Sequence, residues 1–594
     1  MSILSLRSWR CLAVIIATIT AQTGFASSPS GAPIQIKSAP KIDLSKPDGG
    51  LAPVAGVENI AVFRASRAAP DRAEGKGYTY NHHPDIAVWH GRLYVAWDSG
   101  QKDEDTWPAR ELYSTSVNGR DWSKPAELFP QGTSTPTRLY FFLAPNGRML
   151  AFAGMRVSHA KTEETRKGPI VVREIHPDHT LGTVYIVRPP IDTALPPNAP
   201  PLYTESSDQH FIQACEQLLN AHVTLETQDN GVFLDPDQRI AWHNAKAWPD
   251  GKIGRGFWKA PSFFHRADGT LVGIGKNGWT TTSTDGVNWT QPVVPPTLVT
   301  NNAKVWGQRT PDGHYALVYN PTLRPRYPLA IVSGADGVTF GDMRAVQAHF
   351  PPQRYPGLNK NTGLQYVRGV AEWDNDGSVA DTQHAMWIVY SANKEDIWVS
   401  RIPTPIAAIG SGWNTYQPKW ATVTTTPTGA TIESREPFDC AEATRLITPS
   451  PRVTADLTLT TPASGLGAVD VALVGDTGGA VPVRLRFAGD GFLRALDGMK
   501  MVEYGRFDPG ATVTLHLTAD GTRHRFTVTV NGGKPTEAQF AESCASLARL
   551  RIRVWARADG DRPFDPTPAT ASVGPEFDQP APSVTTRVTG VTFD

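Results

Sequence analysis

The sequence is poor in cysteine, has no excess charge of one sign and has no long apolar segment beyond its first residues. Four cysteines in 594 residues are too few for a disulfide framework to support a chain of this size. Lysine plus arginine number 57 and the acidic residues also number 57, a balance that argues against nucleic acid as a partner. No later window is apolar over the roughly 20 residues of a spanning helix, so we expect no membrane span.

The first 26 residues have the pattern of an export signal. Arg7 and Arg10 precede an apolar stretch at 12–21, and residues 24–26 supply a small-residue cleavage site. We therefore expect residues 1–26 to be removed and the mature protein to be secreted or periplasmic.

Removal of this segment would take Cys11 and leave Cys215, Cys440 and Cys544. An odd number of cysteines in an oxidising compartment implies at least one unpaired thiol. Cys440 and Cys544 both lie in the C-terminal part, so they are the pair to test for a disulfide.

The length predicts more than one domain, because 594 residues are too many for a single compact core. Residues 27–56 are rich in Ser, Pro, Ala and Gly without a periodic apolar face, which predicts an exposed linker. The repeating pattern that follows changes after Pro405. We expect one domain over 57–405 and a second over 406–594.

Short aromatic or β-branched strands alternate with glycine turns throughout residues 57–405. This alternation predicts antiparallel hairpins. The turns are His90-Gly91, Asn146-Gly147, Asp268-Gly269 and Asp312-Gly313.

A second type of turn identifies the architecture. Residues 283–289 match a shortened Asp-box, with Ser283, Asp285 and Gly286 closing the turn and Trp289 packing on a neighbouring hairpin. Weaker copies occur at 333–340 and at 113–122. Three copies favour a β-propeller, and about 350 residues at about 40–50 per blade give seven blades. Six blades are the alternative if residues 156–250 are mostly an insertion.

The region 156–250 also contains a helical pattern. Ser206 and Gln209 could form a capping box. Apolar and aromatic residues then recur at helical spacing, at Phe211, Ile212, Cys215, Leu218, Leu219 and His222.

After Pro405 the sequence predicts a β-sandwich of jelly-roll type. Strands of alternating polarity are separated by Gly turns at 497–498, 520–521 and 531–532. This part has no cluster of catalytic residue types, so support of the propeller or carbohydrate binding is its expected role. The predicted fold class is therefore all-β, a seven-bladed or six-bladed propeller followed by a β-sandwich.

Two adjacent histidines give the strongest chemical signal. His82 and His83 precede Pro84, which favours an extended backbone at His83 and therefore imidazoles on opposite sides of the chain. One of them would face the central cavity. A structural role is the more common one for either histidine alone.

Charged segments at 102–105 and 393–396 are far apart in sequence but would be neighbours in a closed propeller. They could hold a cation, orient a lysine or form a solvated ion-pair network. Residues 374–377 resemble a fragment of a calcium loop without the downstream glutamate. A structural calcium is therefore possible, although no cofactor is required and no metal ligand is assigned.

Cations alternate with tryptophan at two places. Arginine binds carboxylates bidentately and indole stacks on the apolar face of a pyranose, so such groups suit acidic sugars. The two groups are Arg255, Trp258 and Lys259, and Lys304, Trp306 and Arg309.

The motifs at 80–84, 97–105, 268–272, 365–369 and 390–398 together resemble those of the BNR-repeat, or Asp-box, sialidase-like propellers. Within these the sequence is most similar to the group of seven-bladed ulvan lyases and of lyases and rhamnosidases acting on rhamnose linked to glucuronate. The resemblance covers about 57–405. The sequence departs from the group at Asp98-Ser99, where Ser-Asn is expected, and at Lys259, where a glutamate is common.

The resemblance implies chemistry centred on histidine, with tyrosine and arginine assisting. The catalytic candidates are His82, His83, His210 and Tyr140. The candidates for substrate binding are Asn81, Arg138, Arg255, Trp258, Lys259 and Arg368.

The implied function is cleavage of an acidic polysaccharide or oligosaccharide, containing uronate or rhamnose, by β-elimination in a monomeric exported enzyme. Histidine or tyrosine would remove the proton beside a carboxylate that arginine or lysine neutralises. The alternatives are a rhamnosidase-like or sialidase-like hydrolase and a non-catalytic glycan-binding propeller. Against a sialidase, the one Arg-Ile-Pro motif, at 401–403, lies at the end of the propeller instead of its beginning.

Overall fold

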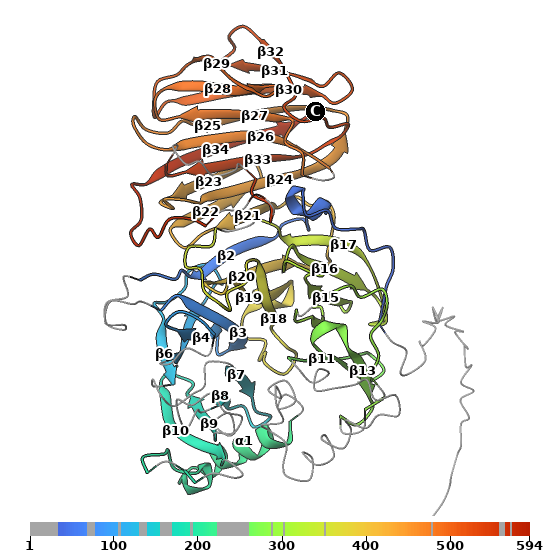
Figure 1. The fold of residues 1–594 in the computed structure, drawn as a ribbon, viewed down its shortest axis with the longest axis vertical. Coiled ribbons are helices and arrows are strands. Elements are labelled where there is room, and N and C mark those ends of the chain that lie inside the picture. Colours follow the sequence, from blue (N-terminus) through green and yellow to red (C-terminus); the bar gives the residue numbers. More distant parts are fainter. Residues whose placement is uncertain are drawn as a thin grey trace, which may run out of the picture.

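The computed structural model of the chain consists mainly of β-strands, which form a propeller-like domain and a C-terminal β domain (Figure 1). This confirms the predicted all-β class. The described residues contain one α-helix, α1 (Gln209–Asn220), and none of their helices is long and apolar enough to cross a membrane. The structure describes residues 34–594 except 68–77, 105–108, 130–138, 155–168, 190–193, 196, 222–259, 287–288, 291, 301–302, 350–351, 477–478, 558–564, 569 and 571–572.

Antiparallel hairpins build each blade, and their turns contain the glycines that the sequence marks. His90 and Gly91, between β3 (Tyr80–Trp89) and β4 (Arg92–Gly100), have φ angles of 46° and 76°. A two-residue turn with two positive φ angles matches the twist of the flanking strands. The other predicted hairpin turns also have glycine at positive φ, at Gly147, Gly269 and Gly313.

Four sheets belong to the propeller alone. The first contains β3, β4, β5 (Ala109–Ser116) and β6 (Ala126–Phe129). The second contains β7 (Leu139–Leu143), β8 (Met149–Gly154), β9 (Ile170–Ile175) and β10 (Leu181–Arg188). The third contains β11 (Ser262–His265), β12 (Leu271–Ile274) and β13 (Thr280–Ser283). The fourth contains β14 (Trp306–Arg309), β15 (Tyr315–Tyr319), β16 (Leu329–Gly334) and β17 (Thr339–Gln347).

A fifth group of propeller strands joins the two ends of the propeller sequence. β18 (Leu364–Gly369), β19 (Ala385–Ala392) and β20 (Asp396–Pro403) form a meander, and β2 (Glu58–Phe63) pairs antiparallel with β20. β3, at the start of the first sheet, packs against β18 and β19. The first and last blades are therefore neighbours.

The number of blades differs from the prediction. The described residues form four propeller sheets and the fifth, shared group, so neither seven nor six blades is confirmed. The region 156–250 is only partly an insertion, because it supplies β9 and β10 to the second sheet before α1 begins. Residues 222–259, between α1 and β11, lie outside the described part.

The segment expected as a linker is partly built into the propeller. β1 (Gln35–Ile36) pairs in parallel with β17. Ile34, Leu51 and Val54 are buried in the cores of the neighbouring blades. The composition of 27–56 suggested exposure, but these few apolar residues are enough to fix residues 34–56 to the domain.

One buried ion pair connects the inner strands around the axis. Arg368 Nε lies 2.6 Å from Asp85 Oδ1, and Asp85 Oδ2 accepts the backbone N–H of Phe141 at 2.7 Å. The Arg368 guanidinium is 4.6 Å from the centroid of the Tyr140 ring and 5.4 Å from that of Trp306. These residues belong to β18, β3, β7 and β14, so four blades meet at Arg368.

Two of the three predicted Asp-boxes share one turn geometry. Ser283 Oγ donates to Asp285 Oδ1 at 3.0 Å and accepts the N–H of Gly286 at 2.9 Å. The copy within 113–122 repeats both hydrogen bonds, at 3.1 and 2.8 Å. In the copy at 333–340 the aspartate accepts two backbone N–H groups instead.

Two packed sheets form the C-terminal domain, which confirms the predicted second β domain. One contains β21 (Trp413–Gln417), β24 (Cys440–Ser450), β33 (Leu547–Trp555), β26 (Ala468–Gly475), β27 (Val483–Ala488), β28 (Phe492–Asp497) and β29 (Lys500–Arg506). The other contains β22 (Ala421–Thr426), β23 (Gly429–Ser434), β34 (Val584–Phe593), β25 (Arg452–Thr460), β30 (Thr512–Asp520), β31 (Arg525–Val530) and β32 (Thr536–Gln539).

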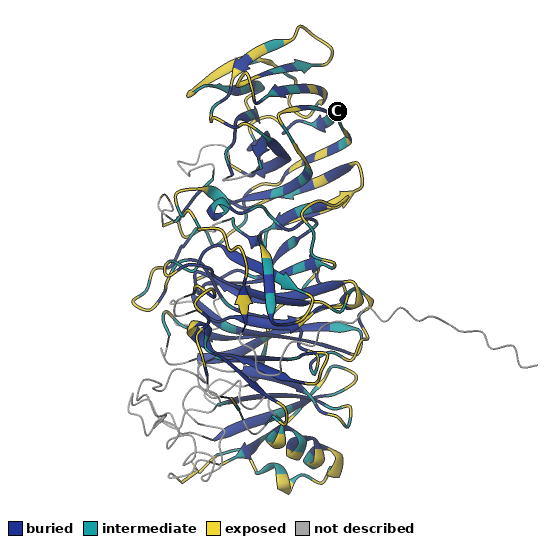
Figure 2. Ribbon diagram, turned by 90° about the vertical axis from the view of Figure 1, so that its right-hand side faces the viewer, coloured by how far each residue is buried: buried dark blue, intermediate teal, exposed yellow. Residues whose placement is uncertain are grey.

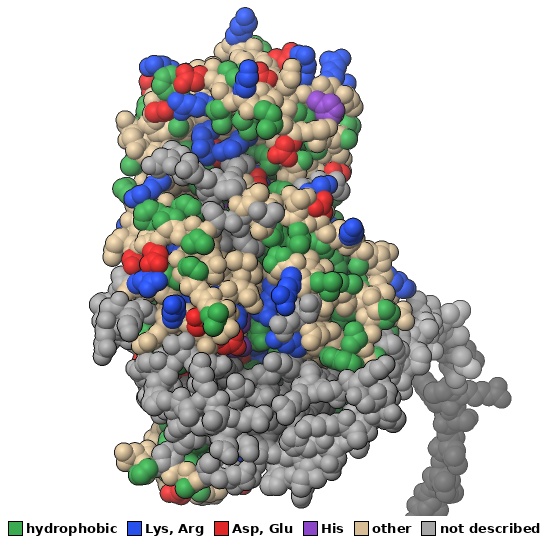
Figure 3. Space-filling view, viewed as in Figure 1, with side chains coloured by type: hydrophobic (Ala, Val, Ile, Leu, Met, Phe, Trp, Pro, Cys, Tyr) green, Lys and Arg blue, Asp and Glu red, His purple; other side chains and the backbone are tan. Residues whose placement is uncertain are grey.

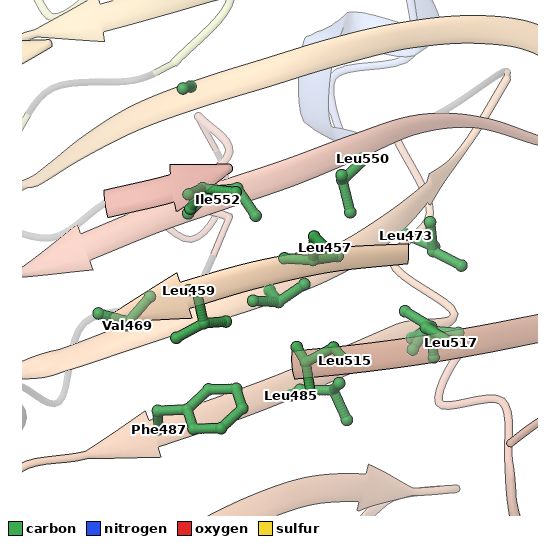
Figure 4. Close-up of a cluster of buried hydrophobic side chains, with 14 of the residues drawn as sticks. Leu457, Leu459, Val469, Leu473, Leu485, Phe487, Leu515, Leu517, Leu550 and Ile552 are labelled. Atoms are coloured by element: carbon green, nitrogen blue, oxygen red, sulfur yellow. The ribbon is translucent and has the colours of Figure 1, made fainter. Parts of the chain in front are cut away.

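Aliphatic side chains from both sheets fill the space between them (Figure 4). Buried and exposed residues alternate along many of the sandwich strands, whereas most propeller strands are buried along their length (Figure 2). This difference explains why the sandwich strands have the clearer period of two in the sequence.

A continuous sheet joins the two domains. β2 of the propeller pairs with β20 on one side and, in parallel, with β21 of the sandwich on the other. The sheet of eleven strands therefore runs from β18 in the propeller to β29 at the edge of the sandwich.

Two local predictions need correction. Helix α1 begins where predicted, but its N-cap is Asp208, which accepts the N–H groups of His210 and Phe211, and not Ser206. Cys440 and Cys544 are not bonded to each other in a disulfide. Cys440 packs against Trp555, whereas Cys544 Sγ donates to a backbone carbonyl at 2.8 Å.

The axial ion pair yields the first testable prediction. Asp85 is fully buried and Arg368 is 3% exposed, so Asp85→Ala would leave a buried guanidinium without its carboxylate. We expect a loss of about 3–5 kcal/mol in the free energy of unfolding, measured by urea denaturation. Asp121→Ala, at an exposed Asp-box turn, is the control and should change stability by about 0.5 kcal/mol or less. Equal effects of the two substitutions would contradict the role of the axial pair.

Candidate functional site

Polar side chains converge at one face of the propeller, from the starts of inner strands and from the loops after second strands. In an up-and-down blade these two places lie at the same face. Figure 3 shows Lys, Arg and acidic side chains near the middle of the propeller domain. We call the following six residues the His–Tyr cluster: His82, His83, Tyr366, Lys276, Arg326 and Lys394.

The two histidines lie side by side, contrary to the expectation that they point to opposite sides. Their ring centroids are 4.3 Å apart. The strand pairing of β3 shifts between His82 and Asp85, and His83 has a φ of 48°. This bulge overrides the extended conformation that Pro84 favours and turns both imidazoles toward the same space.

Each histidine has a different partner. His82 is fully buried, and its Nδ1 lies 2.6 Å from Ser391 Oγ. His83 Nδ1 lies 3.0 Å from Asp98 Oδ2, and the Asp98 side chain is completely buried. If His83 Nδ1–H donates to this carboxylate, the other ring nitrogen, Nε2, keeps its lone pair and can accept a proton.

Tyr366 completes the arrangement. Its ring centroid lies 4.5 Å from that of His82 and 4.5 Å from that of His83. The Lys276 ammonium donates to Tyr366 Oη at 2.9 Å, and the Arg326 guanidinium lies 5.3 Å from the ring centroid. A phenol that contacts two imidazoles and two cations can donate or accept a proton at this site.

Lys394 connects the cluster to an acidic loop. Its ammonium lies 2.7 Å from Glu104 Oε2 and donates to the backbone carbonyl of Asn359 at 2.8 Å. Asp103 accepts the backbone N–H groups of residues 358 and 359. The described part of the first charged segment, residues 102–104, therefore meets the segment 393–396 as predicted, in a partly buried network.

Burial controls the protonation of this region. Desolvation holds the pKa of His82 well below its usual range, and the nearby charges of His83, Lys394, Arg326 and Lys276 lower it further. Desolvation also lowers the pKa of Lys394, although Glu104 opposes the shift. His82 is therefore a neutral imidazole near pH 7.

The backbone of the cluster is strained. Non-glycine residues with positive φ occur at His83, Tyr366, Asn277, Asn393 and Lys394, with φ between 48° and 68°. Each costs of order 1 kcal/mol or more, and such residues concentrate at active sites and ligand clamps. Their coincidence at one face supports a functional role for that face.

Of the other predicted site residues, Asn81 uses its side-chain amide for hydrogen bonds within the protein. Its side-chain nitrogen donates to the carbonyl of Glu395 at 2.9 Å, and its side-chain oxygen accepts from Trp97 Nε1 at 3.1 Å. Arg368 is likewise used at the axis, where it contacts Asp85. The structure thus gives both predicted substrate-binding residues internal partners.

Tyr140 and His210 do not join the His–Tyr cluster. Tyr140 is buried against Phe152, with ring centroids 5.8 Å apart, and contacts Arg368. His210 is exposed on α1, which lies at the end of the propeller farthest from the sandwich in both ribbon views (Figures 1 and 2). Arg138, Arg255, Trp258 and Lys259 lie outside the described residues.

The predicted calcium-loop fragment lies in the connection between β18 and β19 and contacts the neighbouring blade. Asp376 accepts the backbone N–H of His90 at 2.7 Å with one oxygen and that of Ser378 at 2.9 Å with the other. Arg401, in the Arg-Ile-Pro motif, pairs with Asp381 at 2.6 Å. Asp376 and Arg401 therefore have partners within the protein, which is consistent with structural roles for both.

Sequence reasoning missed Tyr366, Lys276 and Arg326 as site residues. Tyr366 lay in a motif of the resemblance, but no pattern gave it a chemical role. Lys276 begins a short 3-10 helix, η5 (Lys276–Gly278), and Arg326 lies in the loop between β15 and β16. The only feature of the sequence that could have indicated a site role for them is that each follows the second strand of a blade, where the connections reach this face.

Family models match both domains. A model described as BT_1020-like, N-terminal beta propeller matches residues 32–231. A second, described as Sialidase-like, CBM domain, matches residues 413–571. The N-terminal part is thus similar to a propeller family, and the C-terminal part is similar to a sialidase-like CBM domain.

Among solved structures, one titled "Sialidase" has 26% identity and a TM-score of 0.80, covering 95% of this chain and 54% of its own. The chain thus spans about half the length of that protein. The Trypanosoma rangeli sialidase has 11% identity and a TM-score of 0.31 over 85% of this chain and 97% of its own, too low to support an argument. The search of curated proteins gave no match. Closeness to lyases or rhamnosidases receives no support from these comparisons.

The buried neutral His82 predicts a pH dependence of stability. Its folded pKa is lowered, so below pH about 6.5 the unfolded chain binds a proton that the folded chain does not. Stability contributed by neutral His82 is therefore lost as the pH falls below about 6.5, by up to about 1.4 kcal/mol per unit. In urea denaturation between pH 7 and 5, the free energy of unfolding should fall less steeply with falling pH for His82→Gln than for the wild type. Equal slopes would contradict a buried neutral His82.

Proposed function

We propose that the sialidase-like propeller is a glycan-active enzyme that cleaves an acidic saccharide at the His–Tyr cluster. The observation that carries this proposal is the contact of Tyr366 with both imidazoles, beside Lys276 and Arg326. The similarity to a protein titled "Sialidase" supports action on glycans. Export of the mature chain as a monomer is part of the same proposal.

Cations at the cluster favour a substrate with a carboxylate. Lys276 and Arg326 both contact Tyr366, and Lys394 is close enough to influence His82. Lys394 is paired with Glu104. A uronate carboxylate placed near Lys276 and Arg326 would gain charge-assisted hydrogen bonds.

β-Elimination is the reaction that suits these groups. The cations neutralise the uronate carboxylate, which makes the proton on the adjacent ring carbon more acidic. His83 Nε2, held by Asp98 through Nδ1, removes this proton, and the electron pair forms the ring double bond as the glycosidic C–O bond breaks. Tyr366 gives its hydroxyl proton to the leaving oxygen, and the adjacent Lys276 stabilises the phenolate.

Hydrolysis is the second candidate, because the similar structure is titled "Sialidase". A conventional glycosidase needs two opposed carboxyl groups. In the described part of the cluster, the nearest carboxylates, Asp98 and Glu104, pair with His83 and Lys394. This pairing argues against a conventional two-carboxylate hydrolase, whereas a hydrolase with a tyrosine nucleophile is separated from a lyase by its products.

Turnover of uronate-containing and rhamnose-containing polysaccharides tests the proposal. Elimination gives an unsaturated uronate that absorbs ultraviolet light, whereas hydrolysis gives reducing ends without this absorbance. His83→Ala and Tyr366→Phe should each lower kcat by about 10²–10⁴-fold, the contribution typical of a general acid or base. His314→Ala, at an exposed hairpin turn, is the matched histidine control and should retain wild-type turnover.

The results distinguish the three candidate functions. Formation of reducing ends without ultraviolet absorbance would show that the protein is a hydrolase and not a lyase. Binding of an acidic glycan without turnover by the wild type would identify a binding protein. Wild-type turnover that survives both His83→Ala and Tyr366→Phe would place the chemistry elsewhere.

Charge at the cluster gives a separate prediction. Lys276→Met removes one cation that would face the uronate, so kcat/KM for an acidic polymer should fall by about 10–100-fold, equivalent to one charged hydrogen bond. Methyl esterification of the polymer should reduce wild-type turnover in the same direction. Lys500→Met, in the exposed strand β29, is the control. An unchanged kcat/KM in Lys276→Met would contradict the proposal that the substrate carboxylate binds beside Lys276.

A further inference from the structure

We propose that His349, Asp439 and Cys440 form a transition-metal site, with Zn²⁺ as the preferred ion, at the junction of the two domains. One ligand atom of each residue lies within 4.8 Å of the others. No metal ligand was predicted from the sequence, and His349 is 90 residues from Asp439. The site is separate from the His–Tyr cluster.

The donor set has the chemistry of a zinc site. Imidazole nitrogen, carboxylate oxygen and thiolate sulfur all bind Zn²⁺, whereas Ca²⁺ and Mg²⁺ are bound by oxygen. In a tetrahedral zinc site the ligand atoms lie about 3–4 Å apart. The observed separations need only a small contraction to reach this range, and three protein ligands leave the fourth position for water.

Neighbouring groups hold the ligands in place. Asp439 Oδ1 lies 3.0 Å from His349 Nε2 and accepts the backbone N–H of Cys440 at 2.8 Å. Its other oxygen accepts the hydroxyl of Tyr416 at 2.7 Å. The ring centroids of Tyr416 and His349 are 4.1 Å apart. Such outer hydrogen bonds and packing fix the orientation of ligating carboxylates and imidazoles.

Charge also fits a divalent ion. Binding requires loss of the Cys440 thiol proton to solvent and a neutral His349 with its proton on Nδ1. The ion, the thiolate and the Asp439 carboxylate then sum to zero, so no net charge is buried. Glu442, two residues along β24, is already paired with Arg553 at 2.7 Å and does not disturb this balance.

An entry path exists beside the ligands. His349 and Tyr416 line a cavity between the domains, together with Asn59, Gln347 and Glu442. Cys440 itself is fully buried. An ion can therefore reach His349 from the cavity, and Asp439 Oδ1 lies 3.0 Å from His349 Nε2.

The position indicates what the metal would do. His349 follows β17 of the propeller, whereas Asp439 and Cys440 stand at the start of β24 in the sandwich. A metal bound by all three would link the domains directly. Zinc should therefore raise the thermal unfolding temperature of the full-length protein by preferential binding to the folded state.

Cobalt substitution tests the site. The full-length protein is treated with a chelator, dialysed and titrated with Co²⁺, which gives a thiolate-to-metal absorption band only when cysteine is a ligand. We expect a saturable band at one Co²⁺ per chain, displaced by Zn²⁺. The band should disappear in Cys440→Ser and persist in Cys544→Ser, which alters another buried cysteine. A band that persists in Cys440→Ser, or no band in the folded wild type, would overturn the proposal.

Further variants guard against misfolding of Cys440→Ser. His349→Gln should remove the zinc-dependent rise in unfolding temperature. A cooperative thermal unfolding transition of this variant in the presence of chelator would show that it is folded without metal. Tyr416→Phe removes only the hydrogen bond to Asp439 and should weaken zinc affinity by about 10–100-fold with the Co²⁺ band retained. An equal zinc-dependent rise in wild type and His349→Gln would show adventitious binding and overturn the assignment. None of these outcomes depends on glycan turnover.

Discussion

Pairing of β2 with β20 is the interaction on which the rest of the structure depends. It joins the first strand of the propeller to its last sheet, and this closure places β3 beside β18 and β19. His82 then reaches Ser391, and Tyr366 reaches both histidines. No contact within a single blade could assemble these groups, because they come from opposite ends of the domain sequence. The geometry of the candidate site is a consequence of ring closure.

Local features were predictable from the sequence because local physics determines them. Glycine at a two-residue turn, alternating polarity and the Asp-box each act within about ten residues, and the structure contains the corresponding hairpins. The meeting of residues 102–104 with the segment 393–396 was also predictable, since any closed propeller brings its ends together. The number of blades was not, because it depends on how 156–250 is divided between strands and other structure.

The chemical partners were harder to predict, for the same physical reason. Lys276 and Arg326 belong to connections whose sequences have no special pattern, and only the arrangement of blades brings them to Tyr366. His83 shows a second difficulty, since the bulge in β3 overrides the preference that the following proline imposes. Arg368 has the residue type of a substrate ligand, yet burial beside Asp85 makes it part of the framework.

The unbroken sheet from β18 to β29 also determines how the protein can be divided. A border near residue 405 is clear in the sequence, but a cut there would separate β2 from β21 and leave each of these two strands with an unpaired edge. Exposed edges of this kind promote association between chains. Either half made alone should therefore be prone to aggregate, and the shared sheet holds the sandwich at one fixed orientation to the propeller.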